Sequence, residues 1–128
     1  MRKAIYPGNP EAWTASYSPA VLAQGRFLFI SGQVAFDRNG QVVGPGDIVG
    51  QAERIFENLR EILHAAGAGF EDVIKTNYYI TDVSLFRHVA ALRPRYFSAP
   101  FPASTMVEVK GLVHPELLLE VEAIAAAP

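Results

Sequence analysis

The amino-acid sequence predicts an α+β fold in which two helices cover one face of a mixed β-sheet. Segments rich in β-branched and aromatic residues, which are typical of strands, recur along the whole chain. Two other segments, beginning at Ile48 and Leu85, repeat their apolar residues at helical spacing. The predicted order is three strands, a helix, a strand, a second helix and two final strands.

Three strands and two turns are predicted before the first helix. The strands comprise residues 3–6, 20–24 and 27–31. Gln24-Gly25-Arg26 separates the second strand from the third and predicts a hairpin between them. A further turn follows at Asp37-Arg38-Asn39-Gly40, because an Asn-Gly pair suits the positive φ angles of tight turns.

The first helix is predicted to begin at Ile48 and to end at Ala66. Asp47 precedes it and can cap its first turn through a side-chain oxygen. Gly67 follows it and is typical of a helix C-terminus. The apolar residues of this segment lie on one helical face and are Ile48, Ala52, Ile55, Leu59, Ile62, Leu63 and Ala66.

The second helix follows a strand predicted at residues 73–81. Asp82 can cap this helix, whose apolar residues recur between Leu85 and Phe97. Pro94 lies inside the pattern. It is expected to kink the helix or end it early, because proline has no backbone N–H to donate.

Two alternating strands, residues 106–110 and 117–124, flank a short turn and predict a final hairpin. They carry Glu108, Glu120 and Glu122 at positions where a strand rarely tolerates a carboxylate without a reason. The end of the chain is therefore the first place to search for a functional site.

Helices on one face leave the opposite face of the predicted sheet open. We expect this face to carry apolar residues from 27–30 and 117–119. Such a surface is too apolar to remain in water, so the sequence predicts burial against other subunits.

The composition indicates one domain, residues 1–128, and limits its partners. The longest apolar runs are far shorter than a membrane span, so we expect no membrane contact. A net charge of −2 provides no long-range attraction for nucleic acid. The chain has no cysteine, which excludes disulfides and thiolate sites and is compatible with the cytoplasm, where we place the protein.

Short motifs in a fixed order connect this chain to a known family. They are YSPAV at 17–21, FISGQ at 29–33, AAG at 65–67, DVIKT at 72–76, YITD at 79–82, VEV at 107–109 and EVEAIA at 120–125. Each motif is weak alone. Together, in order and at matching spacing, they resemble the reactive intermediate deaminase (Rid, or YjgF-like) family nearly end to end.

The resemblance implies a chorismate-mutase-like α+β fold and a homotrimer whose sheets line a central barrel. It also implies a small-molecule cleft at each subunit interface. We expect no cofactor. No pair among the three histidines has the spacing of metal ligands, so we expect no metal site either.

One position departs from the family pattern. Members with deaminase activity carry an arginine directly after Pro-Ala, whereas this chain has Ser104. A guanidinium binds the carboxylate of a 2-imino acid through two parallel hydrogen bonds, which a hydroxyl cannot replace. Ser104 and Thr105 suit a neutral amide, hydroxyl or carbonyl, and Met106 forms an apolar, adaptable wall. We therefore expect the substrate to differ from a standard 2-imino acid.

The resemblance also implies roles for four other residues. Glu120 would position a water for attack on an imine carbon, Tyr17 would close the cleft, and Ser31 and Gly32 would form its wall. Each has a simpler structural interpretation. Glu120 could face solvent on an edge strand, Tyr17 could be an ordinary packed aromatic, and Ser31-Gly32 could end a strand. The hydroxyls near residue 104 could bond only to local backbone groups.

Three arginines, Arg87, Arg93 and Arg95, cluster near the second helix. Their simplest interpretation is a solvated face. The alternative is that one of them extends into a neighbouring cleft and replaces the missing arginine.

Three functions are compatible with these features. The first is a Rid-type enzyme that adds water to an imine, enamine or related small carbonyl metabolite. The second is a non-catalytic trimer that binds a small molecule. The third, a ribonuclease, is the weakest, because the chain is acidic and lacks a basic, aromatic stripe.

Overall fold

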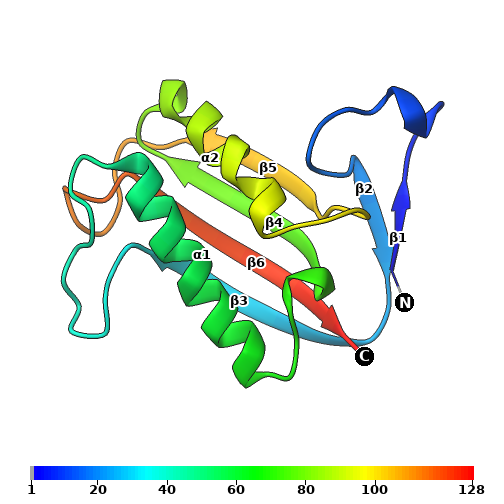
Figure 1. Cartoon of the computed structure of the whole chain (residues 1–128), viewed down its shortest axis with the longest axis horizontal. Helices are drawn as coiled ribbons and strands as arrows, with labels where there is room; N and C mark the ends of the chain where they lie inside the picture. The colour runs from blue at the N-terminus through cyan, green and yellow to red at the C-terminus, as the bar shows by residue number, and fades with distance from the viewer. Residues whose placement is uncertain (1) are drawn as a thin grey trace.

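A four-stranded mixed sheet forms the body of the molecule (Figure 1). The computed structural model describes residues 2–128. The spatial order β3-β6-β4-β5 places β6 and β4 in the centre, with β4 and β5 parallel and the other pairs antiparallel. The strands are β3 (Arg26–Val34), β4 (Val73–Ile80), β5 (Ala103–Glu108) and β6 (Leu119–Ala127). The predicted α+β class and the order of elements are confirmed.

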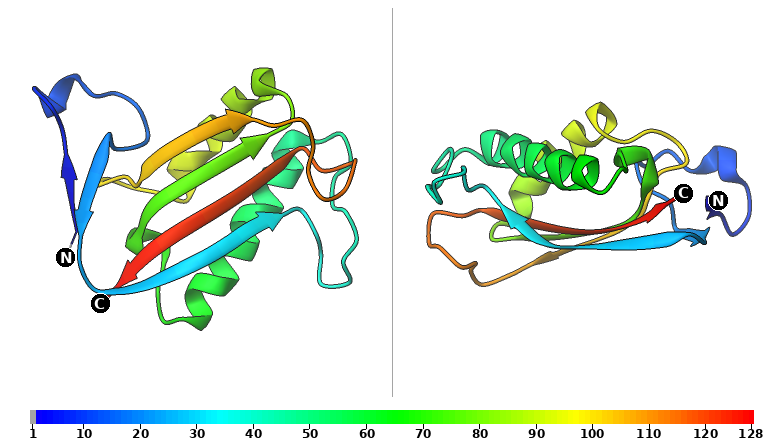
Figure 2. Two further views of the ribbon diagram at one scale, coloured as in Figure 1. Left: turned by 180° about the vertical axis from the view of Figure 1, so that it is seen from behind. Right: turned by 90° about the horizontal axis from the view of Figure 1, so that it is seen from below.

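Both helices, α1 (Ile48–Ala65) and α2 (Phe86–Leu92), pack on the same face of this sheet, as the edge-on view of Figure 2 shows. The Asp47 side chain accepts a hydrogen bond of 3.0 Å from the Gly50 N–H and caps α1. Gly67 follows α1 with a φ of 73°, a conformation that glycine adopts without strain. No helix in residues 2–128 is long and apolar enough to cross a membrane.

The second helix is shorter than its apolar pattern. It ends at Leu92, and a 3₁₀ turn that contains Pro94 follows at Arg93–Arg95. Asp82 caps a separate 3₁₀ turn, Val83–Leu85, by accepting a hydrogen bond of 3.0 Å from the Ser84 N–H. The early end at Pro94 was therefore predicted correctly, whereas the cap acts one turn before α2.

The predicted hairpin at Gln24-Gly25-Arg26 is wrong. The strand before it, β2 (Ala20–Ala23), pairs with β1 (Arg2–Ile5) in a separate two-stranded sheet, while β3 pairs with β6. Gly25 has a φ of 137°, and a Cβ there would meet the Ala127 carbonyl oxygen at 2.6 Å. This glycine therefore lets the chain pass from one sheet to the other close to the end of β6.

The predicted final hairpin is also wrong. β5 and β6 are consecutive in the sequence, but β4 lies between them and pairs with both. β5 is consequently an edge strand, and β3 is the edge strand on the other side.

Alternate residues of β6 point into the core beneath the helices, where they meet the apolar face of α1. The buried residues of β6 are Leu119, Val121, Ala123, Ala125 and Ala127. The buried apolar residues of α1 are Ile48, Ala52, Ile55, Phe56, Leu59 and Leu63.

The opposite face of the sheet has no helix over it (Figure 2). Phe27 and Phe29 lie on this open face and are 49% and 73% exposed. The expectation for residues 117–119 is wrong, since Leu117 and Leu119 are buried in the core. The side-chain period of a strand is two, so a one-residue difference in register reverses the face that a leucine occupies.

A buried glutamine connects α1 to the loop before β6. Gln51 is fully buried, and its Nε2 donates to the carbonyls of Gly44 and Glu116 at 3.1 and 2.9 Å. Its Oε1 accepts a hydrogen bond of 2.8 Å from the Leu118 N–H. One side chain thus satisfies three backbone groups that no regular element pairs.

We expect Gln51→Leu to lower the free energy of unfolding by about 3 kcal/mol, because buried backbone groups would lose their partners. Chemical denaturation measures this loss. Gln41→Leu, in an exposed turn, is the matched control and should change the stability by less than about 0.5 kcal/mol. Equal effects of the two substitutions would contradict the role given to Gln51.

Candidate functional site

Glu120 and Gly32 meet on the open face of the sheet. The register between β3 and β6 shifts between Ile30 and Gln33, which is the mark of a β-bulge. The Glu120 carboxylate lies over Gly32 so closely that a Cβ at residue 32 would overlap Oε2. Two of the residues predicted for the site are therefore adjacent, and only glycine leaves room for the carboxylate in this position.

The two carboxylates of β6 have different environments. Asn77 Nδ2 and the Tyr79 hydroxyl both donate to Glu122 Oε1, at 2.9 and 2.5 Å. The bond from Tyr79, followed by that from Asn77, lowers the pKa of Glu122, and the same contact with Glu122 raises the pKa of Tyr79. Across residues 2–128, no donor bonds to the Glu120 carboxylate. Glu122 is therefore fixed as a charged acceptor, whereas Glu120 can bond to a water.

Two shallow hollows adjoin these carboxylates on the open face. One, of about 240 Å³, is lined by Tyr79, Leu112, Glu120 and Glu122 among others. The second, of about 300 Å³, contains Ser31, which thus shares the face with Glu120 but lies in a different hollow.

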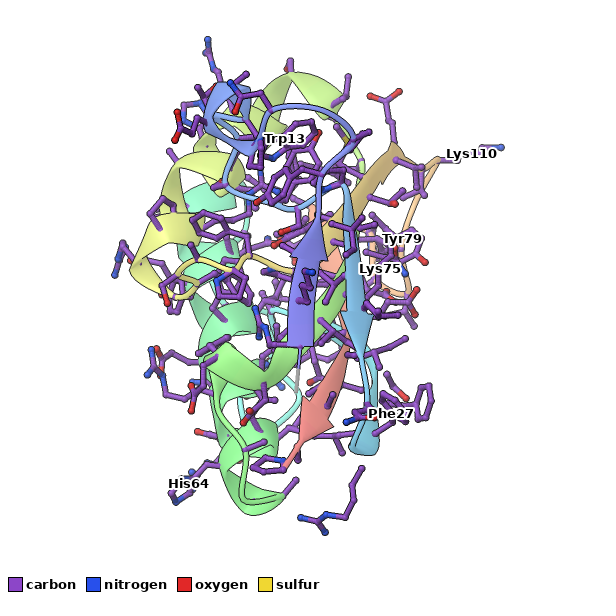
Figure 3. All side chains as sticks on the ribbon, turned by 90° about the vertical axis from the view of Figure 1, so that its right-hand side faces the viewer. Trp13, Phe27, His64, Lys75, Tyr79 and Lys110 are labelled. Atoms are coloured by element: carbon purple, nitrogen blue, oxygen red, sulfur yellow. The ribbon has the colours of Figure 1, made fainter. Side chains whose placement is uncertain are left out.

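Thr105 also belongs to the open face, where its Oγ1 accepts a hydrogen bond of 2.8 Å from Lys75 Nζ. Figure 3 shows Lys75, Tyr79 and Phe27 on the side of the sheet away from α1 and His64.

The other predicted residues, Ser104, Met106 and Tyr17, gather at the edge of the sheet that β5 forms. Ser104 and Met106 pair with Thr76 and Tyr78, so they point toward the helices rather than to the open face. Tyr17 reaches this edge because the next residue bridges to Ala103 at the start of β5.

Several contacts hold the Tyr17 segment in place. The Ser18 N–H donates to the Pro102 carbonyl at 2.9 Å, and its hydroxyl donates to the Phe101 carbonyl. The Trp13 ring packs edge-on against the Tyr17 ring with 5.3 Å between centroids, and its Nε1 donates to the Tyr17 carbonyl. Tyr17 is thus positioned next to β5 by its neighbours and remains half-buried.

Arg93 joins this second group, and the expectation of a solvated face is wrong for it. Its side chain is 7% exposed, and its guanidinium carbon lies 5.6 Å from the centroid of the Tyr17 ring. Arg87 is exposed, and Arg95 bonds to Glu53 at 2.9 Å, so these two fit the prediction. The spacing of four residues between Val89, which is buried, and Arg93 was the signal in the sequence.

A single chain does not bring all the predicted residues together. Glu120 lies on β6 and Ser104 on β5, with β4 between them, and the two side chains point to opposite faces. Glu120 is also on a central strand, so its simpler interpretation as an edge-strand charge is wrong.

The comparisons with known proteins agree with this architecture. The family model described as Endoribonuclease L-PSP matches residues 9–127. A Rid-family structure from Yersinia pestis, YyfB, superposes with a TM-score of 0.86 at 34% identity and covers 98% of both chains. The chain belongs to the Rid (YjgF-like) family.

Two curated relatives of this Rid protein cover nearly all of it. A RutC family protein of Pyrococcus horikoshii is 39% identical over 126 residues, which are 98% of each chain. The 2-iminobutanoate/2-iminopropanoate deaminase of Rattus norvegicus is 34% identical over 125 residues, which are 98% of this chain and 90% of the rat protein.

We expect Gly32→Ala to displace the Glu120 carboxylate, because the added methyl group would occupy its place. The cost in stability should be about 1 kcal/mol, since a flexible side chain can rotate away. A crystal structure of the variant and its thermal unfolding measure both effects. Gly111→Ala is the control, because its added Cβ meets no atom within 4 Å. An unmoved Glu120 in Gly32→Ala would contradict the close approach described here.

Proposed function

We propose that this Rid protein is a cytoplasmic homotrimer that hydrolyses an imine, enamine or related small carbonyl metabolite. The observation that carries the proposal is the unbonded Glu120 carboxylate above Gly32, beside a hollow on the open face. The name of the rat relative, a deaminase of 2-imino acids, supports the same reaction class.

The reaction requires little from the protein, because an imine carbon is already electrophilic. Glu120 accepts a proton from a water while the water oxygen bonds to the imine carbon, and the C=N electron pair moves to nitrogen. The proton that Glu120 holds then passes to this nitrogen and gives the neutral carbinolamine. Glu120 next accepts the hydroxyl proton and passes it to nitrogen, the C–N electron pair leaves with ammonia, and the C–O bond becomes the ketone carbonyl. Glu122 remains bonded to Tyr79 and Asn77 and holds the face around the water in a fixed geometry.

We infer that the complete cleft is formed by two subunits. One chain supplies Glu120 and Gly32 from the side of the sheet near the β3 edge, and its neighbour supplies Tyr17 and Ser104 from the β5 edge. The exposed rings of Phe27 and Phe29 support burial of the open face in such an assembly.

Light scattering is expected to give three times the mass of one chain at micromolar concentration. Phe29→Glu should shift the protein toward monomers, because it would bury a charge in the subunit interface. Val113→Glu changes an even more exposed apolar residue, 79% against 73%, and should leave the trimer intact. A stable wild-type monomer would refute the proposed assembly.

For any imine substrate, we expect Glu120→Gln to reduce turnover by roughly 10²–10⁴, the range for loss of a general base. Affinity should change far less, since the substitution keeps the shape of the side chain. Steady-state kinetics and a binding assay separate the two effects. Glu122→Gln, two residues along the same strand face, is the control and should retain most of the turnover. Equal losses of turnover in Glu120→Gln and Glu122→Gln, with both variants folded and trimeric, would show that Glu120 is not the specific general base.

We expect this protein to hydrolyse 2-iminobutanoate with a kcat/KM at least about 30-fold below that of the rat relative. The loss of a bidentate, charge-assisted contact at position 104 costs about 2–5 kcal/mol of binding. Coupled production of the 2-imino acid, followed by ammonia release, measures the rate. Matching rates for the two proteins would show that Ser104 does not limit this substrate.

The second candidate is a non-catalytic trimer that binds a small molecule. Ser104 favours it, because the motif resemblance implies an arginine at this position in members with deaminase activity. Unchanged behaviour of Glu120→Gln with a confirmed ligand would select this function over hydrolysis.

A further inference from the structure

We propose that Arg93 is the anion-binding group of the cleft and that it holds the carboxylate of a small molecule beside Tyr17 and Ser104. The proposal rests on the proposed function for the identity of the cleft. It names the ligand chemistry and assigns its recognition to a residue at the end of α2 rather than to β5.

Arg93 is a buried cation with no carboxylate beside it among the described residues. It is 7% exposed, and its Nε is fully buried and has no hydrogen-bond partner within residues 2–128. Among residues 2–128, no carboxylate lies within 4.0 Å of its guanidinium. Burying a charge without a counterion is costly, so this position favours an anion that comes from outside the chain.

Two further polar groups lie in the core near Arg93. The hydroxyls of Thr76 and Tyr78 are buried, and within residues 2–128 neither makes a hydrogen bond of full geometry, although Tyr78 lies close enough to Thr76 and Arg93 to interact with both. Burial raises the pKa of Tyr78 to about 12, and the positive charge of Arg93, followed by hydrogen bonding with Thr76 and Arg93, partly opposes this rise. The phenol therefore keeps its proton at neutral pH and can donate it in a hydrogen bond.

The groups around Arg93 select an acceptor. Guanidinium N–H groups donate only, and the hydroxyls of Thr76, Tyr78 and Ser104 on this face of the sheet also have protons to donate. Ser104 pairs with Thr76 across the strands, so its hydroxyl belongs to this side of the sheet. An ionised carboxylate, which accepts through both oxygens and donates nothing, matches this set.

Aromatic rings restrict how the ligand approaches. The guanidinium carbon lies 5.6, 5.7 and 5.4 Å from the ring centroids of Tyr17, Tyr78 and Phe86. These rings stabilise the cation and occupy space around it, which favours approach to the edge where the N–H groups point. A planar carboxylate bonds to that edge through two parallel contacts. Tyr17 and Ser104 are half-buried, so part of each of these two side chains is in contact with solvent.

The position of Arg93 in the fold has a consequence for the choice of substrate. Arg93 extends from the turn after α2, whereas a side chain at position 104 extends from β5. Binding of a carboxylate through Arg93 therefore does not by itself place the C=N carbon of 2-iminobutanoate next to Glu120. Weak turnover of 2-iminobutanoate and binding of carboxylates are then compatible properties of one site.

The first experiment follows the Arg93 Nε–H resonance of the wild-type trimer by NMR during addition of butanoate, butanamide or inorganic phosphate. Butanoate should shift this resonance saturably, whereas the neutral butanamide should not, and phosphate should bind more weakly. The resonance is assigned by its absence from Arg93→Lys. No shift with butanoate, or an equal shift with butanamide, would overturn the proposal. Tighter binding of phosphate would also overturn it, in favour of a general anion site.

The second experiment measures butanoate affinity by calorimetry in three variants. Arg93→Gln should bind about tenfold to 100-fold more weakly, the range for one charge-assisted hydrogen-bonding group. Arg93→Lys keeps the positive charge but loses the planar guanidinium that forms two parallel hydrogen bonds. Its affinity for butanoate should therefore lie between those of Arg93→Gln and the wild type. Arg87→Gln, an exposed arginine in α2, is the control and should bind like the wild type. If Arg93→Gln does not fold, Arg93→Lys decides the question, and wild-type affinity in it would overturn the proposal.

Failure of this proposal can be distinguished from failure of the proposed function. Butanoate binding needs no reaction, so it can be measured in Glu120→Gln. Binding that depends on Arg93, in a protein that hydrolyses no imine, would retain the carboxylate site and reject the hydrolase. Imine turnover without any butanoate binding would do the reverse.

Discussion

The alternation of residues along β6 is the constraint on which the rest of the structure depends. This strand lies between β3 and β4, so its side chains must suit two very different faces. The residues that point beneath the helices are apolar, and Glu120 and Glu122 stand between them. A shift of one residue would bury both carboxylates and expose the core, at a cost of many kcal/mol. Packing of the core therefore determines where the acids lie.

The open face then separates the two acids by their hydrogen bonds. Glu122 is fixed by Tyr79 and Asn77, whereas Glu120 lies over a glycine and bonds to neither. Of the two acids, Glu120 is thus the one that can bond to a water, and Glu122 is the one that its neighbours hold in place.

Much of the fold was predictable from the sequence because periodicity and caps are local signals. Asp47, Gly67 and Pro94 bound the helices as their chemistry requires. Strand pairing depends on contacts between distant residues, so both predicted hairpins were wrong. In the site, motif order led to Glu120 and Gly32, which are adjacent. The burial of Arg93 was not predicted. It results from contacts of the residue after α2 with Tyr17 and with β4, and the residue pattern of one segment contains no information on contacts with distant segments.

Glu120 and Ser104 lie on different strands and point to opposite faces of the sheet, which also affects how the subunits depend on one another. In the proposed trimer, each cleft takes its carboxylate from one chain and its arginine from the next. Chains lacking Glu120 form only defective clefts among themselves, and so do chains lacking Arg93. A trimer mixed from both kinds contains one junction at which an intact carboxylate faces an intact arginine. Two inactive forms of the protein would thus restore one another, so the cleft belongs to the ring of subunits rather than to any one chain.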